Sequence, residues 1–406
     1  GLDRYEARTV ILERLRAAGD LEDGIPHPMV VGRCDRCGTV VEPRLSVQWF
    51  VHVQPLAERA LASVREGRTR IVPAHFEKVY AHWMENIRDW AVSRQLWWGH
   101  RIPAWYCPDG HITVSDEEIG PAACATCGRP VAELRQETDI FDTWFSSGLW
   151  PFSTLGWPDE TPDYRRFYPT SVMETGYDII FFWVARMMML GLFLTGVEPF
   201  HTVYLHGIVR AEGGVKMGKT KGNVVDPLEV VDAVGADALR FALTVSTSPG
   251  SDQRLSDAKL DGARNFTNKL WNAARFVLGS RPPELAESAG DPGLAERWIA
   301  SRLSEATTRA TRQLDELDLA GYAATLHEVA WSDVCDWFIE MAKVDLRRDD
   351  LSDGERARVW RAAAGALATL MRLLHPIMPF VSEAIWEALH AHAPQATDGE
   401  PLLLTA

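Results

Sequence analysis

The chain has 406 residues, of which 46% are hydrophobic and 24% charged, as in soluble globular proteins, and its length predicts about two or three domains. A net charge of −14 argues against nucleic-acid binding driven by bulk charge, while leaving room for local basic patches. No apolar run is expected to reach the ~18 residues of a membrane span, because the run from Ile179 to Leu194 is interrupted by Arg186. We therefore expect a cytoplasmic protein that does not enter a membrane.

The two ends suggest a fragment of a longer protein. The chain opens with Gly1 rather than Met and without a signal-peptide pattern, and it stops directly after the apolar run Leu402–Leu404. Motifs that are absent here are therefore expected to lie outside the sequence.

The first segment combines a predicted helix with a cysteine pair. Apolar residues at helical spacing predict an amphipathic helix within residues 1–24, ended by Gly19. Cys34 and Cys37 follow in a CxxCG pattern, which supplies only half of a tetrahedral metal site. Either the partner ligands lie upstream of the sequence, or the pair no longer binds metal.

A second group of cysteines has the spacing of a complete metal site. A helix predicted over 55–65 and a buried strand predicted over 101–106 lead into a short polar insert, residues 107–130. Its pattern is C-x3-H…C-x2-C, formed by Cys107, His111, Cys124 and Cys127. An insert this small cannot hold itself together, which is how structural zinc modules are built. The alternative is a degenerate module with His111 on the surface.

The chain is rich in tryptophan, with 16 residues. We expect most of them to lie in a core or an interface, including Trp90, Trp97, Trp98, Trp337 and Trp386. Two invite another interpretation. Trp144 follows Asp142 in a segment of small polar residues. Trp183 comes one helical turn after Ile179, so that the side chains of Ile179 and Trp183 share a face of the predicted helix. The three could wall a small apolar pocket, with plain core packing as the simpler alternative.

The segment before that helix contains Gly176 and Asp178. Glycine allows close approach of a ligand, and the carboxylate could accept hydrogen bonds from ribose hydroxyls or act only as a helix N-cap.

A strand predicted over 202–209 leads into a loop rich in lysine and glycine, residues 213–223. Glycines let the backbone turn tightly, and lysines are point charges suited to phosphate oxygens. The alternative is a solvated basic surface loop. Asp226 and Pro227 then predict the start of a helix.

Beyond about residue 260, helical periodicity dominates and predicts a bundle. The predicted helices cover 261–278, 298–317, 322–344, 355–374 and 379–390. In the second, one face carries Ile299, Leu303, Ala306, Ala310, Leu314 and Leu317. Residues 281–293 form the first long connection, and Cys335 is expected to be a core thiol.

Together these motifs resemble the class I aminoacyl-tRNA synthetases, and their valine branch more than its isoleucine and leucine relatives. The resemblance rests on Ser93–His100, Asp142–Ser147, Thr175–Trp183, Lys216–Pro227, Gly235–Arg240, Asn265–Asn272 and His375–Phe380. Residues 216–220 correspond to the KMSKS signature, with Gly218 and Thr220 in place of its serines. The other signature, His-Ile-Gly-His, is absent, as are most of the editing insertion and the C-terminal coiled coil.

The resemblance implies three parts. Residues 1–45 would end the editing insertion and carry half of a zinc knuckle. Residues 46–259 would be the second half of a Rossmann-type α/β catalytic domain with a parallel sheet, including the zinc insert and the loop 216–220. Residues 260–406 would be an all-α, helical-bundle anticodon-binding domain.

The resemblance also implies the chemistry: ATP-dependent activation of valine to valyl-adenylate, then transfer to tRNA(Val). Lys216 and Lys219 would be catalytic, and the implied ATP site consists of Gly176, Asp178, His206, Gly207, Lys216, Met217 and Lys219. Trp144, Ile179 and Trp183 would hold the valine side chain. Mg²⁺ with ATP, a structural Zn²⁺ and a monomeric state are expected. The alternatives are an isoleucine or leucine enzyme, or a non-catalytic tRNA-binding fragment.

Overall fold

The computed structural model describes residues 1–22, 24–34, 37–42, 45–117, 120–210, 224–245 and 248–400. The chain divides into two compact units, Gly1–Trp49 and Phe50–Ala406. In the first unit, α1 spans Arg4–Ala18 and is capped by the Asp3 side chain. Gly19 ends this helix in the left-handed conformation, as predicted. None of the residues of α1 is fully buried, however, so the helix does not pack an apolar face into a core of the described part of the unit.

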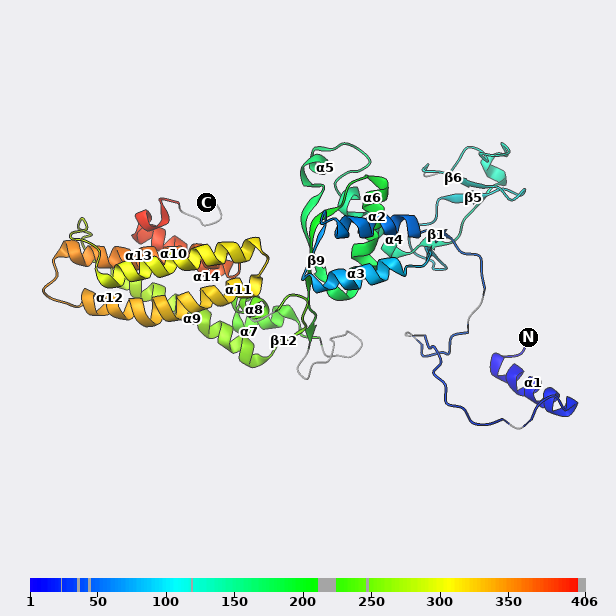
Figure 1. Ribbon diagram of the computed structural model, residues 1–406, viewed down its shortest axis with the longest axis horizontal. Coiled ribbons are helices and arrows are strands. Elements are labelled where there is room, and N and C mark those ends of the chain that lie inside the picture. The colour runs from blue at the N-terminus through cyan, green and yellow to red at the C-terminus, as the bar shows by residue number, and fades with distance from the viewer. Residues whose placement is uncertain are drawn as a thin grey trace. The chain divides into compact units, whose positions relative to one another are not determined.

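A three-stranded parallel sheet organises the first half of the second unit. The strand order is β2 (Arg70–Val72), β10 (Phe200–His206) and β9 (Thr170–Gly176). Its core includes side chains of α2 (Gln54–Arg65) and α3 (His75–Glu85), which lie beside the sheet in Figure 1. Parallel strands joined by helical crossovers are the pattern of a Rossmann-type sheet, which confirms the α/β prediction.

The crossover from β9 to β10 is helical throughout but not α-helical throughout. It consists of a 3₁₀ turn, Tyr177–Ile179, a π-helix, Ile180–Ala185, and α6, Arg186–Leu194. The window Tyr177–Leu194 has 18 residues and is long and apolar enough to cross a membrane by length and composition. The window contains two charged residues, Asp178 and Arg186, so the apolar run from Ile179 is interrupted and shorter than a membrane span, as predicted. In the fold, 56% of the window is buried.

Short elements connect the sheet with the cysteine insert and the lysine-rich loop. Two antiparallel pairs precede α4 (Thr143–Ser153): β1 (Phe50–Val51) with β3 (Trp90–Ala91), and β4 (Ser93–Arg94) with β8 (Ile140–Phe141). The insert is built on β5 (Ala104–Tyr106), β6 (Ile112–Val114), the 3₁₀ turn Val131–Glu133 and β7 (Arg135–Gln136). The strand predicted over 101–106 is thus shorter than expected. The remaining elements here are α5 (Pro162–Phe167), β11 (Val209–Arg210) and β12 (Gln253–Arg254).

The second half is a helical bundle around its own core, as predicted, with the long helices side by side in Figure 1. Its elements are α7 (Pro227–Val234), α8 (Ala236–Thr244), α9 (Asp257–Gly279), α10 (Leu294–Asp315), α11 (Leu319–Glu328), a π-helix (Val329–Phe338), α12 (Ile339–Leu346), α13 (Asp353–Leu374), α14 (Pro379–His392) and a 3₁₀ turn (Pro394–Thr397). Asp226 caps α7 as predicted. The core of the bundle also includes Phe241 of α8, which precedes the predicted domain boundary near residue 260. That boundary stays a prediction.

Several predicted core positions are confirmed and others are not. Cys335 is buried, and burial raises the pKa of its thiol to about 11. Trp386 is fully buried, but Trp97 and Trp98 are exposed, as is Trp337. These three tryptophans do not pack in a core of the described structure, whereas their expected alternative, packing at an interface, stays a prediction. Leu317 lies beyond the end of α10 with φ of 62°, so it does not continue the face that Ile299 begins.

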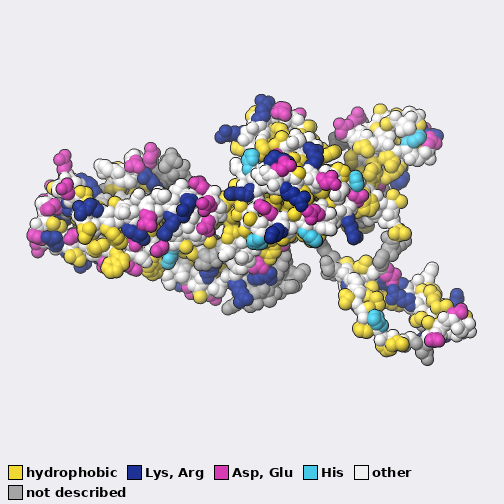
Figure 2. All heavy atoms as spheres, in the orientation of Figure 1, with side chains coloured by type: hydrophobic (Ala, Val, Ile, Leu, Met, Phe, Trp, Pro, Cys, Tyr) yellow, Lys and Arg dark blue, Asp and Glu magenta, His cyan; other side chains and the backbone are white. Residues whose placement is uncertain are grey.

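Charged side chains are mixed over the surface of the bundle. Figure 2 shows basic and acidic side chains interspersed on the face of the helices that it presents. Such a surface fits the expectation that any nucleic-acid partner is bound through local groups and not through bulk charge.

Candidate functional site

The predicted nucleotide-binding residues meet at one edge of the parallel sheet. Gly176 ends β9, His206 ends β10, and the two are paired in register. In open α/β sheets, ligands bind outside the carboxyl ends of the strands. A side chain at position 176 would lie 2.8 Å from Asp178 Oδ1 and 3.7 Å from His206 Cε1. The sheet therefore brings Gly176, Asp178 and His206 together, and glycine keeps the space between them open.

His206 is held at the sheet edge by two polar contacts. Its Nε2 lies 3.1 Å from Glu174 Oε1, and its Nδ1 lies 2.7 Å from the Gly207 carbonyl oxygen. The imidazole remains exposed, whereas Gly207 is buried. An exposed ring fixed at the end of a strand is suited to lie against a planar ligand.

Gly207 permits a close approach of two backbone segments. A Cβ atom there would come 1.8 Å from the Ser251 carbonyl oxygen and 2.6 Å from the Asp252 nitrogen. Such a contact is possible only for glycine, because backbone atoms cannot move aside as a flexible side chain can. The sequence predicted a role for Gly207 in ligand contact, and the structure adds a structural reason for the residue.

This close approach supports a prediction for stability. Gly207→Ala should destabilise the chain by about 2 kcal/mol or more, because Ser251 and Asp252 must move. Gly262→Ala is the matched control: Gly262 lies exposed within α9 with no atom within 4 Å of the added carbon. Removing a helical glycine should stabilise by up to about 1 kcal/mol. Urea unfolding followed by circular dichroism measures both, and equal effects of the two changes would contradict the prediction.

Asp252 fastens the segment that leads into the lysine-rich loop. Its Oδ1 accepts a hydrogen bond from the Ile208 backbone N–H (2.8 Å), and its Oδ2 accepts one from Arg210 Nε (2.5 Å). The Ile208 N–H and, after it, the Arg210 and Tyr177 side chains hold the pKa of Asp252 below its ordinary value. The carboxylate thus joins β12 to β11 and to the residue that follows Gly176.

The lysine-rich loop itself lies outside the described residues. Lys216, Met217 and Lys219 all fall in residues 211–223, so their assignments stay predictions. The described structure gives only the residues on each side, with β11 ending at Arg210 and α7 beginning at Pro227.

The residues of the predicted apolar pocket come from two neighbouring elements. Trp144 lies in the first turn of α4, while Ile179 and Trp183 lie on the helical crossover. Trp183 Nε1 donates to the Ser147 carbonyl oxygen of α4 at 3.3 Å. All three predicted side chains are half-buried. The structure therefore brings the two elements together, as the pocket requires.

Phe182 is a neighbour that the sequence did not single out. Its ring stacks on that of Trp144 with centroids 6.1 Å apart. The signal was present, because Phe182 follows Ile179 by three residues and precedes Arg186 by four, which is helical spacing. It was hidden by the adjacent aromatic Phe181, whose ring stacks on Trp83 instead.

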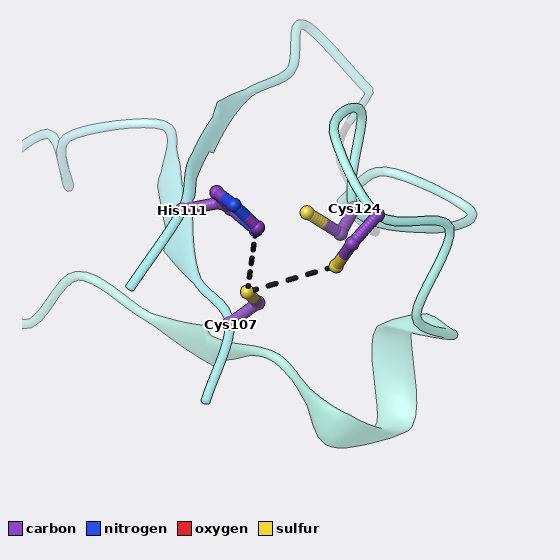
Figure 3. Close-up of side chains that lie close together, drawn as sticks. Cys107, His111 and Cys124 are labelled. Atoms are coloured by element: carbon purple, nitrogen blue, oxygen red, sulfur yellow. Dashed lines mark hydrogen bonds between the residues drawn. The ribbon is translucent and has the colours of Figure 1, made fainter. Parts of the chain in front are cut away.

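The four ligands predicted for zinc converge in the insert. Figure 3 shows Cys107, His111 and Cys124 facing a common centre, and the donor atoms of the full set, with Cys127, lie within 4.8 Å of one another. Cys107 Sγ lies 3.3 Å from His111 Nδ1 and 3.8 Å from Cys127 Sγ. A tetrahedral zinc ion with Zn–S bonds near 2.3 Å separates its sulfur ligands by about 3.8 Å. The arrangement fits such an ion.

Local turns explain why these side chains converge. Gly110 and Gly128 adopt left-handed conformations and donate backbone hydrogen bonds to the carbonyl oxygens of Cys107 and Cys124. The backbone N–H groups of Cys127 and Thr126 lower the pKa of the Cys124 thiol to about 6. A thiol that ionises this readily is a ready metal ligand.

The N-terminal cysteine pair lies in the same kind of turn as the cysteines of the insert, but without the same neighbouring ligands among the described residues. Gly38 is left-handed and donates to the Cys34 carbonyl oxygen at 2.8 Å, as in the insert. A hydrogen bond with the Thr39 side chain lowers the pKa of the Cys37 thiol. Among the described residues, no third ligand joins Cys34 and Cys37. A metal-binding role of this pair stays a prediction.

The comparisons with known proteins agree with this geometry. A family described as "tRNA synthetases class I (I, L, M and V)" matches residues 13–256, and one described as "Anticodon-binding domain of tRNA ligase" matches residues 296–403. Valine–tRNA ligase of Dehalococcoides mccartyi is 50% identical over 100% of this chain, and that of Geobacter sulfurreducens is 51% identical over 97%. The chain spans 45% and 44% of the length of these two relatives.

Solved structures share the fold. Mycobacterium tuberculosis methionyl-tRNA synthetase in complex with methionyl-adenylate has a TM-score of 0.72 at 19% identity, covering 91% of this chain and 68% of that one. Agrobacterium radiobacter LeuRS in a ternary complex with tRNA and LeuAMS has a TM-score of 0.62 at 21% identity, covering 81% and 45%. With the first family matching more than half of its length, the chain belongs to the class I tRNA synthetases of the isoleucine, leucine, methionine and valine group.

Proposed function

We propose that this chain is the part of a valine–tRNA ligase that supplies half of the ATP site, walls of the valine pocket and the anticodon-binding helices. The observation that carries the proposal is identity of about 50% with valine–tRNA ligases along the whole chain. The meeting of Gly176, Asp178 and His206 at one sheet edge supports the nucleotide-binding role.

The proposed reaction has two steps. The carboxylate of valine attacks the α-phosphate of ATP, which forms valyl-adenylate and releases pyrophosphate. The valyl group then passes to the 2′-hydroxyl of the terminal adenosine of tRNA(Val), and AMP leaves. Catalysis of this kind depends on positioning and on stabilising charge that develops in the transition state.

The residues of the proposed ATP site have different roles. Asp178 would accept hydrogen bonds from the ribose hydroxyls beside Gly176, and His206 and Gly207 would lie along the adenine. The catalytic lysines, Lys216 and Lys219, would hold the β- and γ-phosphates, with Met217 beside them and Mg²⁺ accompanying the ATP.

The side chain of valine would lie among Trp144, Ile179 and Trp183. Such an apolar pocket cannot strongly reject threonine, which has the same shape as valine with a hydroxyl added; a preference of only about 10² is already known for the valine enzymes as a class. A further discriminating step outside this pocket is therefore expected in the full protein.

The insert would hold a structural zinc ion through Cys107, His111, Cys124 and Cys127. Four protein ligands leave no open position, so the ion would stabilise the fold and take no part in the reaction. We expect the full protein to act as a cytoplasmic monomer.

Amino-acid-dependent ATP–pyrophosphate exchange by the full-length protein tests the proposal. Valine should support exchange, threonine should support it with kcat/KM about 10² lower, and isoleucine should not fit. Faster exchange with isoleucine or leucine would favour the other branches of the family. Exchange with none of these amino acids would leave the non-catalytic tRNA-binding alternative.

A further inference from the structure

A buried guanidinium lies beside the wall of the proposed valine pocket. Arg186, the first residue of α6, is only 8% exposed. Its Cζ lies 3.9 Å from the ring centroid of Trp90, 5.6 Å from that of Phe182 and 5.8 Å from that of Trp144. The guanidinium lies over the ring of Trp90. In this position it also lies near the two rings that stack on each other at the proposed pocket, those of Trp144 and Phe182.

A buried carboxylate joins the same cluster to the backbone of α4. Asp142 is 5% exposed and caps α4, its Oδ1 accepting a hydrogen bond from the Trp144 N–H at 3.3 Å. Its Oδ2 accepts from Arg94 Nη2 at 2.7 Å and from Trp90 Nε1 at 3.1 Å, and it lies 3.8 Å from Arg186 Nη1. One carboxylate thus ties the first turn of α4 to the strands before the insert and to α6.

The cluster is a costly way to stabilise a fold. Burial lowers the pKa of Arg186 to about 10, against the attraction of Asp142, and its Nη1 has no hydrogen-bond partner in the described structure. Buried ion pairs are often no more stabilising than apolar residues of the same volume, and they are retained in some proteins because they fix one conformation. If the pair of Asp142 and Arg186 fixes the position of α4, it also fixes the position of the Trp144 indole on this helix.

We infer that Asp142 and Arg186 are positioning residues that set where the rings of Trp144 and Phe182 stand, and thereby the size of the amino-acid pocket. The inference rests on the proposed function, because it concerns the same pocket. Neither residue touches the substrate. Their effect is expected on the choice and binding of the amino acid, and not on ATP.

Two variants of the full-length protein test this, with a matched control. Asp142→Asn keeps the shape of the side chain and removes its charge, and Arg186→Met keeps most of the volume. Asp237→Asn is the control, because Asp237 is also 5% exposed and also accepts a hydrogen bond from the first turn of a helix, from the Val381 N–H of α14 at 2.6 Å. It lies in the helical core, apart from the pocket residues.

In valine-dependent exchange, Asp142→Asn and Arg186→Met should raise the KM for valine about tenfold or more, with the KM for ATP changed less than about twofold. The preference for valine over 2-aminobutyrate, which lacks one methyl group, should fall by a similar factor. Asp237→Asn should leave both properties unchanged. A merely structural role would instead lower the amount of active enzyme and leave both KM values alone.

A spectroscopic measurement keeps the inference independent of activity. In protein labelled with 5-fluorotryptophan, the ¹⁹F resonance of Trp144, assigned through Trp144→Phe, should move in both variants and stay in place in Asp237→Asn. Trp90→Phe removes the N–H donated to Asp142 and leaves a smaller aromatic ring against Arg186, and it should move the resonance in the same direction even where the other variants fold poorly.

The outcomes separate the two claims. A wild-type protein without valine-dependent exchange would overturn the proposed function, while the ¹⁹F resonance would still decide whether Asp142 and Arg186 position Trp144. An active wild type whose variants keep the KM and selectivity for valine, with an unmoved resonance, would overturn the inference alone.

Discussion

Lys219→Ala in the full-length protein is expected to slow valyl-adenylate formation by about 10²–10³-fold, the usual cost of removing one group that stabilises transition-state charge. The lysine would meet the β- and γ-phosphates as negative charge builds on the departing pyrophosphate. Binding of tRNA should change little, because the anticodon-binding helices lie elsewhere in the chain. Valine-dependent pyrophosphate exchange and filter binding of tRNA measure the two effects separately.

The neighbouring Lys221 provides the control for this experiment. It has the same charge and lies in the same loop, but outside the five residues that correspond to the signature. Lys221→Ala should therefore slow exchange much less than Lys219→Ala. An unchanged exchange rate for Lys219→Ala would remove the loop from the mechanism, and equal losses for both lysines would indicate a general effect of loop charge.

Removal of one metal ligand should have the largest structural effect. We expect the wild type to bind about one zinc ion per chain. Cys124→Ala should abolish this binding and unfold residues 107–130, because small metal sites couple binding to folding. Metal analysis of the purified protein and limited proteolysis within the insert check the two parts. The strands of the sheet β6–β5–β7 have only two or three residues each, so we expect that the sheet alone cannot hold the insert folded.

Cys37→Ser is the control for the metal experiment. Cys37 is an exposed cysteine in a turn of the same shape, but no complete ligand set surrounds it in the described structure. The variant should retain the zinc content of the wild type. Retention of zinc by Cys124→Ala, or its loss from Cys37→Ser, would contradict the assignment of the site.

Features that depend on nearby residues could be predicted from the sequence. The spacing of Cys107, His111, Cys124 and Cys127 sets two tight turns, and glycines close each of them. Helical periodicity predicted the long helices of the bundle, since an amphipathic helix must bury one face. Of the three-stranded sheet, the sequence predicted only a strand over 202–209, which corresponds to β10 (Phe200–His206) but ends three residues later, and it did not predict β9.

Features that depend on distant residues could not be predicted in the same way. Arg186 interrupts an apolar run in the sequence, but it is buried because Asp142, 44 positions earlier, and Trp90 lie against it. The π-helices 180–185 and 329–338 have no periodicity that distinguishes them from α-helices over so few residues. The exposure of Trp97 likewise reflects what surrounds it and not its own hydrophobicity.

Aminoacylation of tRNA by the full-length protein is the most direct test of the account. Supplied with ATP, Mg²⁺ and total tRNA, the protein should esterify labelled valine to the tRNA that carries a valine anticodon, and periodate oxidation of the uncharged 3′ ends should leave that tRNA protected. Preferential charging with isoleucine or leucine, or no charging while valine-dependent exchange proceeds, would contradict the assignment of this chain to a valine–tRNA ligase.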